Sequence, residues 1–288
     1  MTDQSTAAYT AERPLDDRPG ERPAVALEQV TKRYLGDNDL LALDGISLTV
    51  RPGEFVTLVG ASGCGKSTLL NLVSGLDSPT SGSVQVDGQA AFMFQEHALF
   101  PWLSALDNVA TPLRLRGVGR KDREEQAREY LAAVHLSGFA DRRPHELSGG
   151  MKQRVAIART LATRAPVLLM DAPFGALDAM TRDLLHDELE SIWRERHLTV
   201  LFVTHNVREA VRLGDRVVLL SSRPGRIVAE YDVAIDRPRR IEDRVVSALA
   251  GQITDALRRE VARHGACPQC CPAQSPAGRW PPRHRPRR

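Results

Sequence analysis

Apolar positions along the chain fall into short strand-like patterns that begin near Ala24. Apolar residues recur in two stretches, from Val25 to Val30 and from Ile46 to Val50, and a Pro52-Gly53 turn follows. Four short runs rich in β-forming residues predict further strands, and the first of them reads as buried. These runs are Phe55–Val59, Val167–Met170, Thr199–Val203 and Arg216–Leu220.

Helical patterns separate these runs. The residues after Lys66 suit a helix, and most of 105–165 reads as helical, with dense Glu/Arg pairing in Lys121–Val134. A helix is also predicted over Gly149–Ala162, with Pro166 as its stop. Strands that alternate with helices predict a largely parallel sheet covered by helices.

An apolar residue every fourth position near the C-terminus predicts an amphipathic helix over 241–265. Either this helix packs on the core, or it makes a dimer or regulatory contact. Polar ends, 1–23 and 266–288, are predicted to be disordered, which leaves 24–240 as the folded domain. The positions of the stripe are Ile241, Val245, Leu249, Ile253, Leu257 and Val261.

Composition narrows the possible functions. The 288 residues are 42% hydrophobic and 26% charged, as in ordinary globular proteins, and show no internal repeat. The net charge of +3 is too small to indicate a nucleic-acid partner. No apolar run approaches the ~18 residues of a membrane helix, and the first residues lack a secretory signal. We therefore expect a cytoplasmic protein that reaches a membrane only through a partner.

Four cysteines are present, and one of them, Cys64, lies in a glycine-rich segment. The Cys-x-x-Cys-Cys spacing of the others predicts either exposed thiols in a disordered tail or, with His264 or His284, a zinc site. The clustered cysteines are Cys267, Cys270 and Cys271.

A phosphate-binding loop follows the strand Phe55–Val59, and a predicted helix follows the loop. Its backbone N–H groups and the helix N-terminus are suited to bind the phosphates of ATP. Lys66 is predicted to bind the β- and γ-phosphates, and the Ser67 hydroxyl to ligate Mg²⁺. Asp171 ends a buried strand and is predicted to hold the same Mg²⁺ through water. The loop reads Gly60-Ala61-Ser62-Gly63-Cys64-Gly65-Lys66-Ser67.

A second motif, Leu147-Ser148-Gly149-Gly150-Met151-Lys152-Gln153-Arg154, lies downstream. Together the two motifs resemble the ATP-binding cassette (ABC) family over about residues 24–225. The resemblance implies a P-loop NTPase cassette of α/β class. Its parts are a RecA-like, mostly parallel core sheet, an antiparallel β subdomain and a helical subdomain inserted at about 96–160.

The resemblance also implies roles at the nucleotide. Gln95 matches the glutamine that senses Mg²⁺ and the attacking water, and His205 matches the switch histidine near the γ-phosphate. Tyr34 matches the aromatic residue that stacks on adenine. With Asp171, Gln95 and His205 form the predicted catalytic set, and Thr68 extends the nucleotide-binding loop.

Other matched residues imply that two subunits share each ATP. Ser148, Gly149 and Gly150 match the signature that reaches the γ-phosphate bound to the opposite subunit, where a helix N-terminus meets an anion. The segment Ala176-Leu177-Asp178 matches the loop that links the two sites. The dimer is expected to be either a homodimer or a pair with a second cassette subunit.

One residue departs from the family pattern: Ala172 stands where a glutamate usually polarises the attacking water. A positioned acid–base group is worth about 10²–10⁴-fold in rate, so its absence alone predicts slow hydrolysis. Three alternatives follow. His205, assisted by Gln95 or Asp178, sustains turnover; a partner cassette supplies the glutamate; or the chain is an impaired, non-hydrolytic regulator.

Three further segments resemble the nitrate/sulfonate/taurine importer subfamily. The first, 94–102, is either ordinary core packing or the surface where a membrane partner docks. The resemblance implies two cassettes beneath two transmembrane permease subunits, with an extracytoplasmic solute-binding protein. It ranks sulfonate-like anions first as the solute, with taurine and nitrate as alternatives. The segments are Phe94–Trp102 with Asp107-Asn108-Val109, Asp171–Asp178 with Thr181-Arg182, and Leu220–Ile227.

Overall fold

A computed structural model describes residues 22–35, 39–175 and 177–265 of the chain. Most of the predicted N-terminal tail and all of the tail 266–288 lie outside these ranges. The three clustered cysteines and His284, four of the five candidate zinc ligands, therefore also lie outside them, as does Ala176.

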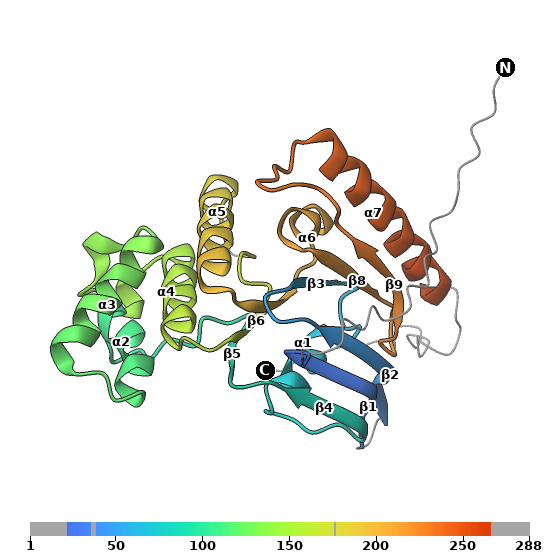
Figure 1. Cartoon of the computed structure of the whole chain (residues 1–288), viewed down its shortest axis with the longest axis horizontal. Helices are drawn as coiled ribbons and strands as arrows, with labels where there is room; N and C mark the ends of the chain where they lie inside the picture. Colours follow the sequence, from blue (N-terminus) through green and yellow to red (C-terminus); the bar gives the residue numbers. More distant parts are fainter. Residues whose placement is uncertain (1–21, 36–38, 176, 266–288) are drawn as a thin grey trace, which may run out of the picture.

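A six-stranded sheet forms the centre of the molecule (Figure 1). Its order is β5-β6-β7-β3-β8-β9; the first five strands are parallel, and β9 is antiparallel to β8. Neighbouring parallel strands come from separate parts of the chain, as helical crossovers require, whereas β9 directly follows β8 in the chain. The strands are β3 (Phe55–Val59), β5 (Ala90–Met93), β6 (Val167–Asp171), β7 (Thr199–Val203), β8 (Arg216–Leu220) and β9 (Ile227–Asp232).

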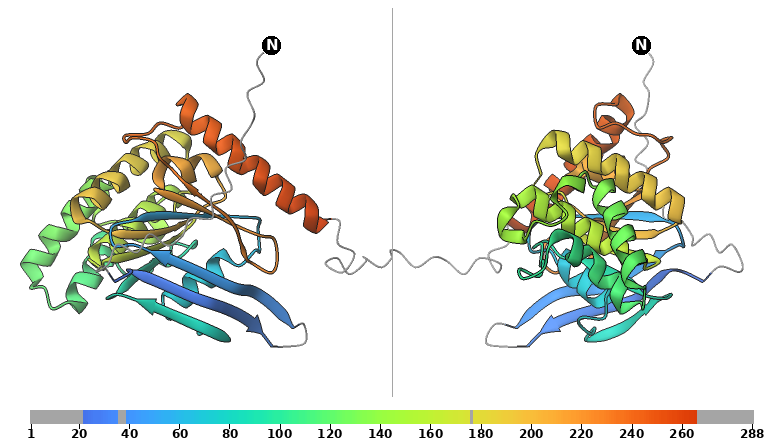
Figure 2. Two further views of the ribbon diagram at one scale, coloured as in Figure 1. Left: turned by 45° about the vertical axis from the view of Figure 1, so that its right-hand side comes forward. Right: turned by 90° about the vertical axis from the view of Figure 1, so that its left-hand side faces the viewer.

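A smaller antiparallel sheet has the order β2-β1-β4, formed by β1 (Val25–Tyr34), β2 (Leu40–Val50) and β4 (Ser81–Val86). Helix α1 (Lys66–Val73) lies between the two sheets, and its buried residues share one apolar cluster with both. Figure 2 shows this second sheet below the core sheet in both views. The packing fixes the first turn of α1, and so the phosphate loop, against the core.

Both faces of the core sheet are buried, because alternate residues of its strands face opposite helices. Phe55 and Phe202 face the cluster that contains α5 (Ala179–Arg196), whereas Val56 and Leu201 face the α1 side. Because both faces are buried, both sets of alternating residues must be apolar, which explains why these strands carry few polar positions. Helix α6 (Val207–Leu213) covers the β3–β8 part of the sheet on the α5 side.

Three helices form a separate lobe between β5 and β6, seen at the left of Figure 1. They are α2 (Ala105–Leu115), α3 (Arg120–Ala133) and α4 (Gly149–Ala162), with short 3₁₀ turns η1 (Ser137–Phe139) and η2 (Pro144–Glu146). Serine side chains accept hydrogen bonds from backbone N–H groups at the starts of α2 and α4. The predicted helices over 105–165 are thus present, and the predicted fold class is confirmed.

The last helix, α7 (Arg244–Gly265), packs on α6 and β9 with a face that coincides with the predicted stripe only at the middle of the helix, where Leu249, Ile253 and Leu257 lie. Val246, Ala250 and Ile253 are buried, whereas Val245 is 63% exposed and Val261 is 46% exposed. A four-residue spacing turns about 40° too far at each step, because an α-helix has 3.6 residues per turn. The stripe was therefore right at its centre and wrong at its ends.

Among the described residues, no helix is both long and apolar enough to cross a membrane.

Candidate functional site

The carboxyl ends of the parallel strands bring the predicted site together. In the sheet register, Leu58 and Asp171 both pair with Val203, and Met93 pairs with Met170. Parallel strands end at one edge of a sheet, where ligands of α/β proteins bind. The segments that follow these strand ends carry the phosphate loop, Asp171, His205 and Gln95, so these groups lie along one edge.

Glycines let the phosphate loop wrap tightly. Gly65 has φ +100° and Gly63 has φ +73°, in the left-handed region that favours glycine. A Cβ on Gly65 would lie 2.6 Å from Leu43 Cδ2 and 2.8 Å from the Ala42 carbonyl oxygen. Within the loop, Lys66 Nζ donates to the Gly60 oxygen at 2.9 Å and to the Ala61 oxygen at 2.8 Å. The ammonium group is therefore held against the backbone of the loop.

Neighbouring positions of the loop differ in exposure. Cys64 is buried and forms no disulfide, and its Sγ lies 3.5 Å from Lys66 Nζ, so the cysteine serves as packing beneath the loop. Ser62 and Ser67 are exposed, and Thr68 is half-buried. The exposed hydroxyl of Ser67 is therefore accessible to a metal ion at the start of α1.

A turn over residues 221–226 packs against the outside of the phosphate loop. A Cβ on Gly225 would lie only 2.3 Å from the Cys64 carbonyl oxygen. The Gly225 N–H donates to the Ala42 oxygen at 2.9 Å, and its oxygen accepts from Asp44 N at 3.0 Å. Arg223 Nε donates to the Gly63 oxygen at 3.4 Å. From the sequence, this turn shows only a family resemblance. In the structure it packs against the phosphate loop and supports it; we call this contact the brace at Gly225.

Asp171 and Ala172 end β6 beside β7. Asp171 is 7% exposed, and the Ala172 N–H donates to the Val203 oxygen at 2.9 Å. Ala172 has φ +45°, and its carbonyl oxygen accepts from Gly175 N at 3.2 Å. An alanine in the left-handed region costs about 1 kcal/mol, so the surrounding contacts hold this backbone in place.

His205 follows β7 on an exposed turn. The Asn206 N–H donates to Thr204 Oγ1 at 3.0 Å, which closes a tight turn around the histidine. Asn206 also caps α6, because its side-chain oxygen accepts from Arg208 N at 3.1 Å. Hydrogen bonds on both sides of His205 thus fix its backbone.

Asp178 and Ser148 both cap helices. Asp178 Oδ1 accepts from Thr181 N at 2.9 Å at the start of α5, and this backbone hydrogen bond is the main reason that the pKa of Asp178 is lowered. Ser148 Oγ accepts from Met151 N at 3.2 Å at the start of α4. Ser148 and Gly149 are exposed and Gly150 is half-buried, so this end of α4 faces outward.

Gln95 begins an exposed segment after β5. Phe94, Phe100 and Trp102 are 43%, 36% and 68% exposed, so 94–102 is not ordinary core packing. Such clustered exposed aromatics indicate an interaction surface. Two rings, those of Phe100 and Trp102, lie 5.5 Å apart between centroids.

Two residues that the sequence did not single out as site residues hold this segment. Asn108 is fully buried; its Oδ1 accepts from Phe100 N at 2.9 Å, and its Nδ2 donates to the Ser104 oxygen at 2.9 Å. Arg159 donates to the oxygens of Ala98 at 2.7 Å and His97 at 3.1 Å. A buried asparagine on an apolar helix face is the one sequence signal that identifies this anchor.

Tyr34 lies at the end of β1, near the phosphate loop. Its hydroxyl donates to Asp77 Oδ2 at 2.9 Å, and Lys32 Nζ lies 4.8 Å from its ring centroid. Burial, followed by the hydrogen bond to Asp77, raises the pKa of Tyr34, so the phenol stays protonated. The ring is 39% exposed and is held by these contacts in one orientation.

Comparison with known proteins agrees with this geometry. A family model described as ABC transporter matches residues 43–175. The taurine import ATP-binding protein TauB of Chromobacterium violaceum is 52% identical over 213 residues, which is 71% of this chain and 81% of that protein. This chain belongs to the ABC transporter ATP-binding proteins.

Two further relatives of this cassette support the assignment. The nitrate import ATP-binding protein NrtD of Synechocystis is 50% identical over 202 residues, covering 67% of this chain and 76% of NrtD. A solved dimeric post-hydrolysis state of the ATP-binding cassette MJ0796, bound to ADP and Pi, has a TM-score of 0.69 at 36% identity. The match covers 74% of this chain and all of that one. The family resemblance seen in the sequence is confirmed, and nucleotide binding follows from it.

The donor atoms of the cassette fit magnesium. The candidate metal residues offer a hydroxyl at Ser67, an amide oxygen at Gln95 and a carboxylate at Asp171, and Mg²⁺ prefers such oxygen ligands. Among residues 22–35, 39–175 and 177–265, no group of three or more His, Cys, Asp or Glu side chains is placed to hold a metal ion. This donor set suits an ion that keeps several waters and binds substrate phosphates.

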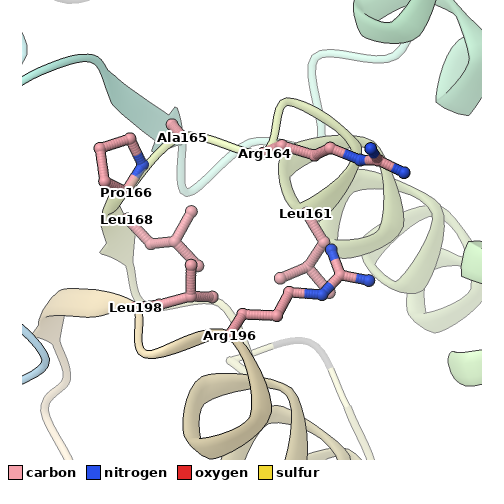
Figure 3. A pocket seen from close by; sticks show the side chains of 7 residues that line it. All are labelled: Leu161, Arg164, Ala165, Pro166, Leu168, Arg196 and Leu198. Atoms are coloured by element: carbon pink, nitrogen blue, oxygen red, sulfur yellow. The ribbon is translucent and has the colours of Figure 1, made fainter.

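A cavity of about 520 Å³ lies at the opposite edge of the core sheet (Figure 3). Pro166 and Leu198 line it just before β6 and β7 begin, so it is remote from the phosphate loop. Two arginines on its wall are tied to α3: Arg164 donates to Gln126 Oε1 at 3.0 Å, and Arg196 to the Tyr130 hydroxyl at 2.7 Å. The cavity marks where the helical lobe joins the core.

Proposed function

We propose that this chain is the ATP-binding subunit of an ABC importer for a small anion, and that it hydrolyses ATP at a site shared by two cassettes. The observation that carries the proposal is the convergence of Lys66, Asp171 and His205 at one sheet edge in a chain of this family. Phosphoryl transfer relies on positioned charges at such an edge more than on covalent chemistry.

Each nucleotide group has a candidate partner. The phosphate loop from Gly60 to Thr68 binds the phosphates through backbone N–H groups and Lys66, whose Nζ already lies within the loop. Ser67, Gln95 and Asp171 would hold Mg²⁺, directly or through water, and the ion would neutralise charge on the phosphates. Tyr34 stacks on adenine with one ring face, since Lys32 lies over the other.

The second cassette completes the site. The outward-facing start of α4 at Ser148, Gly149 and Gly150 is proposed to meet the γ-phosphate of the partner's ATP, because a helix N-terminus attracts anions. Asp178, at the start of α5, is proposed to lie at the same interface. ATP then favours the closed dimer because it bridges two subunits, which gives the closed state its differential affinity.

Hydrolysis must proceed without an acid at Ala172. We propose that His205, with Gln95 or Asp178, positions the attacking water well enough for turnover. The absence of a side-chain acceptor at Ala172 favours a second candidate: an ATP-dependent switch that relies on a partner cassette carrying the glutamate. A homodimer fits the first candidate, and a hetero-pair fits the second.

Relatives of this chain support the proposed class of solute and the proposed permease partners. Proteins named for taurine import and nitrate import share about half of their aligned residues with this chain, which supports a small anion such as a sulfonate, taurine or nitrate. The exposed segment 94–102 is the proposed docking surface for two permease subunits. The cassette would then lie on the cytoplasmic face of the membrane, with a solute-binding protein outside and no nucleic-acid partner.

ATP-driven dimerisation tests the shared site. Sedimentation of the full chain with Mg²⁺ should give a dimer with the non-hydrolysable analogue AMP-PNP and a monomer with ADP. Ser148→Arg should bind AMP-PNP as well as wild type but remain monomeric. The control Ser137→Arg, also exposed in the helical lobe, should behave as wild type. A dimer in Ser148→Arg contradicts the shared site, and a wild type that stays monomeric favours the hetero-pair.

A further inference from the structure

A chain of buried polar side chains runs beneath His205 and joins α5 to α6. We call Arg212, His186, Glu209 and Thr204 the α5–α6 relay; all four are 5% exposed or less. His186 Nε2 lies 2.8 Å from Glu209 Oε1, and His186 Nδ1 lies 2.9 Å from Arg212 Nη1. The Thr204 hydroxyl donates to Glu209 Oε2.

Each proton in the relay has a defined place. A guanidinium only donates, so His186 Nδ1 accepts from Arg212 and the ring carries its proton on Nε2. That proton is donated to Glu209, whose second oxygen accepts from Thr204. Thr204 in turn uses its lone pair to accept from Asn206 N at 3.0 Å. The direction of every hydrogen bond is thus set from Arg212 onward.

The outer end of the relay reaches the surface. Arg212 forms ion pairs with Asp183 at 3.0 Å and with Asp187 at 2.6 Å, and these two carboxylates are 52% and 70% exposed. A buried ion pair is weak evidence for stability, because well-packed apolar residues of similar volume are often equally stable. We therefore expect the relay to fix the positions of α5, α6 and Thr204 relative to one another more than it stabilises the fold.

Both loops at the nucleotide edge touch the relay. The Thr204–Asn206 hydrogen bond closes the turn that carries His205. Phe174, two residues after Ala172, packs edge-on against the His186 ring, with centroids 4.8 Å apart at 81°. His186 thus contacts the loop between β6 and α5 and, through Glu209, the loop after β7.

We infer that the α5–α6 relay positions His205 toward the γ-phosphate and the attacking water. The inference rests on the proposed function and assigns to the relay a task that the missing acid at Ala172 makes necessary. The relay residues act through His205 and touch no substrate atom. Their contribution therefore exists only when the His205 imidazole is present.

Two conservative variants break the relay at its inner end. Thr204→Val keeps the shape but removes the hydroxyl, and Thr204→Ser restores a hydroxyl. Glu209→Gln turns an acceptor toward Thr204 into a donor while its amide oxygen still accepts from His186. Glu188→Gln, which removes a half-buried carboxylate of α5 outside the relay, is the matched control.

A double-mutant cycle with His205→Ala tests whether the effect of the relay on hydrolysis depends on the His205 side chain. In the wild-type background, Thr204→Val and Glu209→Gln should each lower kcat about ten-fold, while ADP affinity stays within about two-fold, because ADP lacks the γ-phosphate. In the His205→Ala background, the same substitutions should change kcat by less than about two-fold. Thr204→Ser and Glu188→Gln should match wild type.

Equal losses in both backgrounds, or an equal loss of ADP affinity, would show a merely structural role and overturn the inference. If wild type hydrolyses ATP no faster than Lys66→Ala, the proposed hydrolysis fails, and AMP-PNP-driven dimerisation serves as the readout for the same cycle. The inference then requires Thr204→Val to weaken dimerisation in wild type but not in His205→Ala. Weakening in both, or in neither, overturns it.

Discussion

The Ala172 N–H donates to the Val203 carbonyl oxygen at 2.9 Å, which binds the end of β6 to the end of β7. The alanine is therefore held one residue beyond Asp171, with φ +45°. Because the backbone is already in the left-handed region, a larger side chain adds little further backbone strain.

Ala172→Glu should therefore fold normally and raise Mg-ATPase activity about 10²-fold, since it supplies a base for the attacking water. The matched variant Ala172→Gln, which has the same size but no basic carboxylate, should stay near wild type. Steady-state ATPase rates measure both. Equal acceleration by Glu and Gln, or none by Glu, would show that water activation is not what this position lacks.

Tyr34 tests the adenine contact. Tyr34→Phe keeps the ring and the Lys32 contact, so ATP affinity should change by less than about two-fold. Tyr34→Ala removes the stacking surface and should weaken ATP binding by about 1–3 kcal/mol, the value of a base–aromatic stack. Isothermal titration with ATP and with inorganic triphosphate separates the base from the phosphates. An equal loss for both ligands would place adenine elsewhere.

The brace at Gly225 predicts a loss of phosphate binding without any change in a phosphate ligand. Gly225→Ala places a Cβ 2.3 Å from the Cys64 oxygen, so either the loop or the turn must move. ATP affinity and Tm should both fall. Gly251→Ala, on α7 with no atom within 4 Å of the new Cβ, should instead stabilise the protein by about 0.5–1 kcal/mol. Unchanged ATP affinity in Gly225→Ala would rule out the brace.

The docking surface predicts two separable defects. Trp102→Ala removes a side chain that is 68% exposed, so Tm should stay within about 1 °C while binding to the permease is lost. Asn108→Leu leaves the Phe100 N–H without its acceptor and should cost about 1–3 kcal/mol of folding free energy in addition to permease binding. Thermal unfolding and co-purification measure the two effects. Permease binding by Trp102→Ala at the wild-type level would move the docking surface elsewhere.

Local motifs were the predictable part of this protein. The phosphate loop at Gly60–Ser67 could be predicted because strand, glycine turn and helix are contiguous and each has its own residue signal. The helix start at Ser148 was equally visible, because a capping serine precedes a helical pattern. The alternation of strands and helices was enough to predict a parallel sheet covered by helices.

Pairings between distant segments were not predictable. Nothing local to β3 indicates that β7 and β8 flank it, because the order depends on crossovers across the whole chain. His186 and Glu209 are 23 residues apart on two helices, and each alone reads as an ordinary polar position. The brace at Gly225 contacts Cys64 in the same way, across a long separation that no spacing rule detects.

Hydrolysis by this chain is tested most directly by its Mg-ATPase rate when it is assembled with its permease partners, compared with the rate of Lys66→Ala. Lys66 contributes the charge within the phosphate loop, so its loss sets the background rate. We expect a wild-type rate well above that background, with most of it lost in His205→Ala. A wild-type rate equal to that of Lys66→Ala, restored by Ala172→Glu, would contradict it and show an ATP-binding switch that needs a catalytic partner.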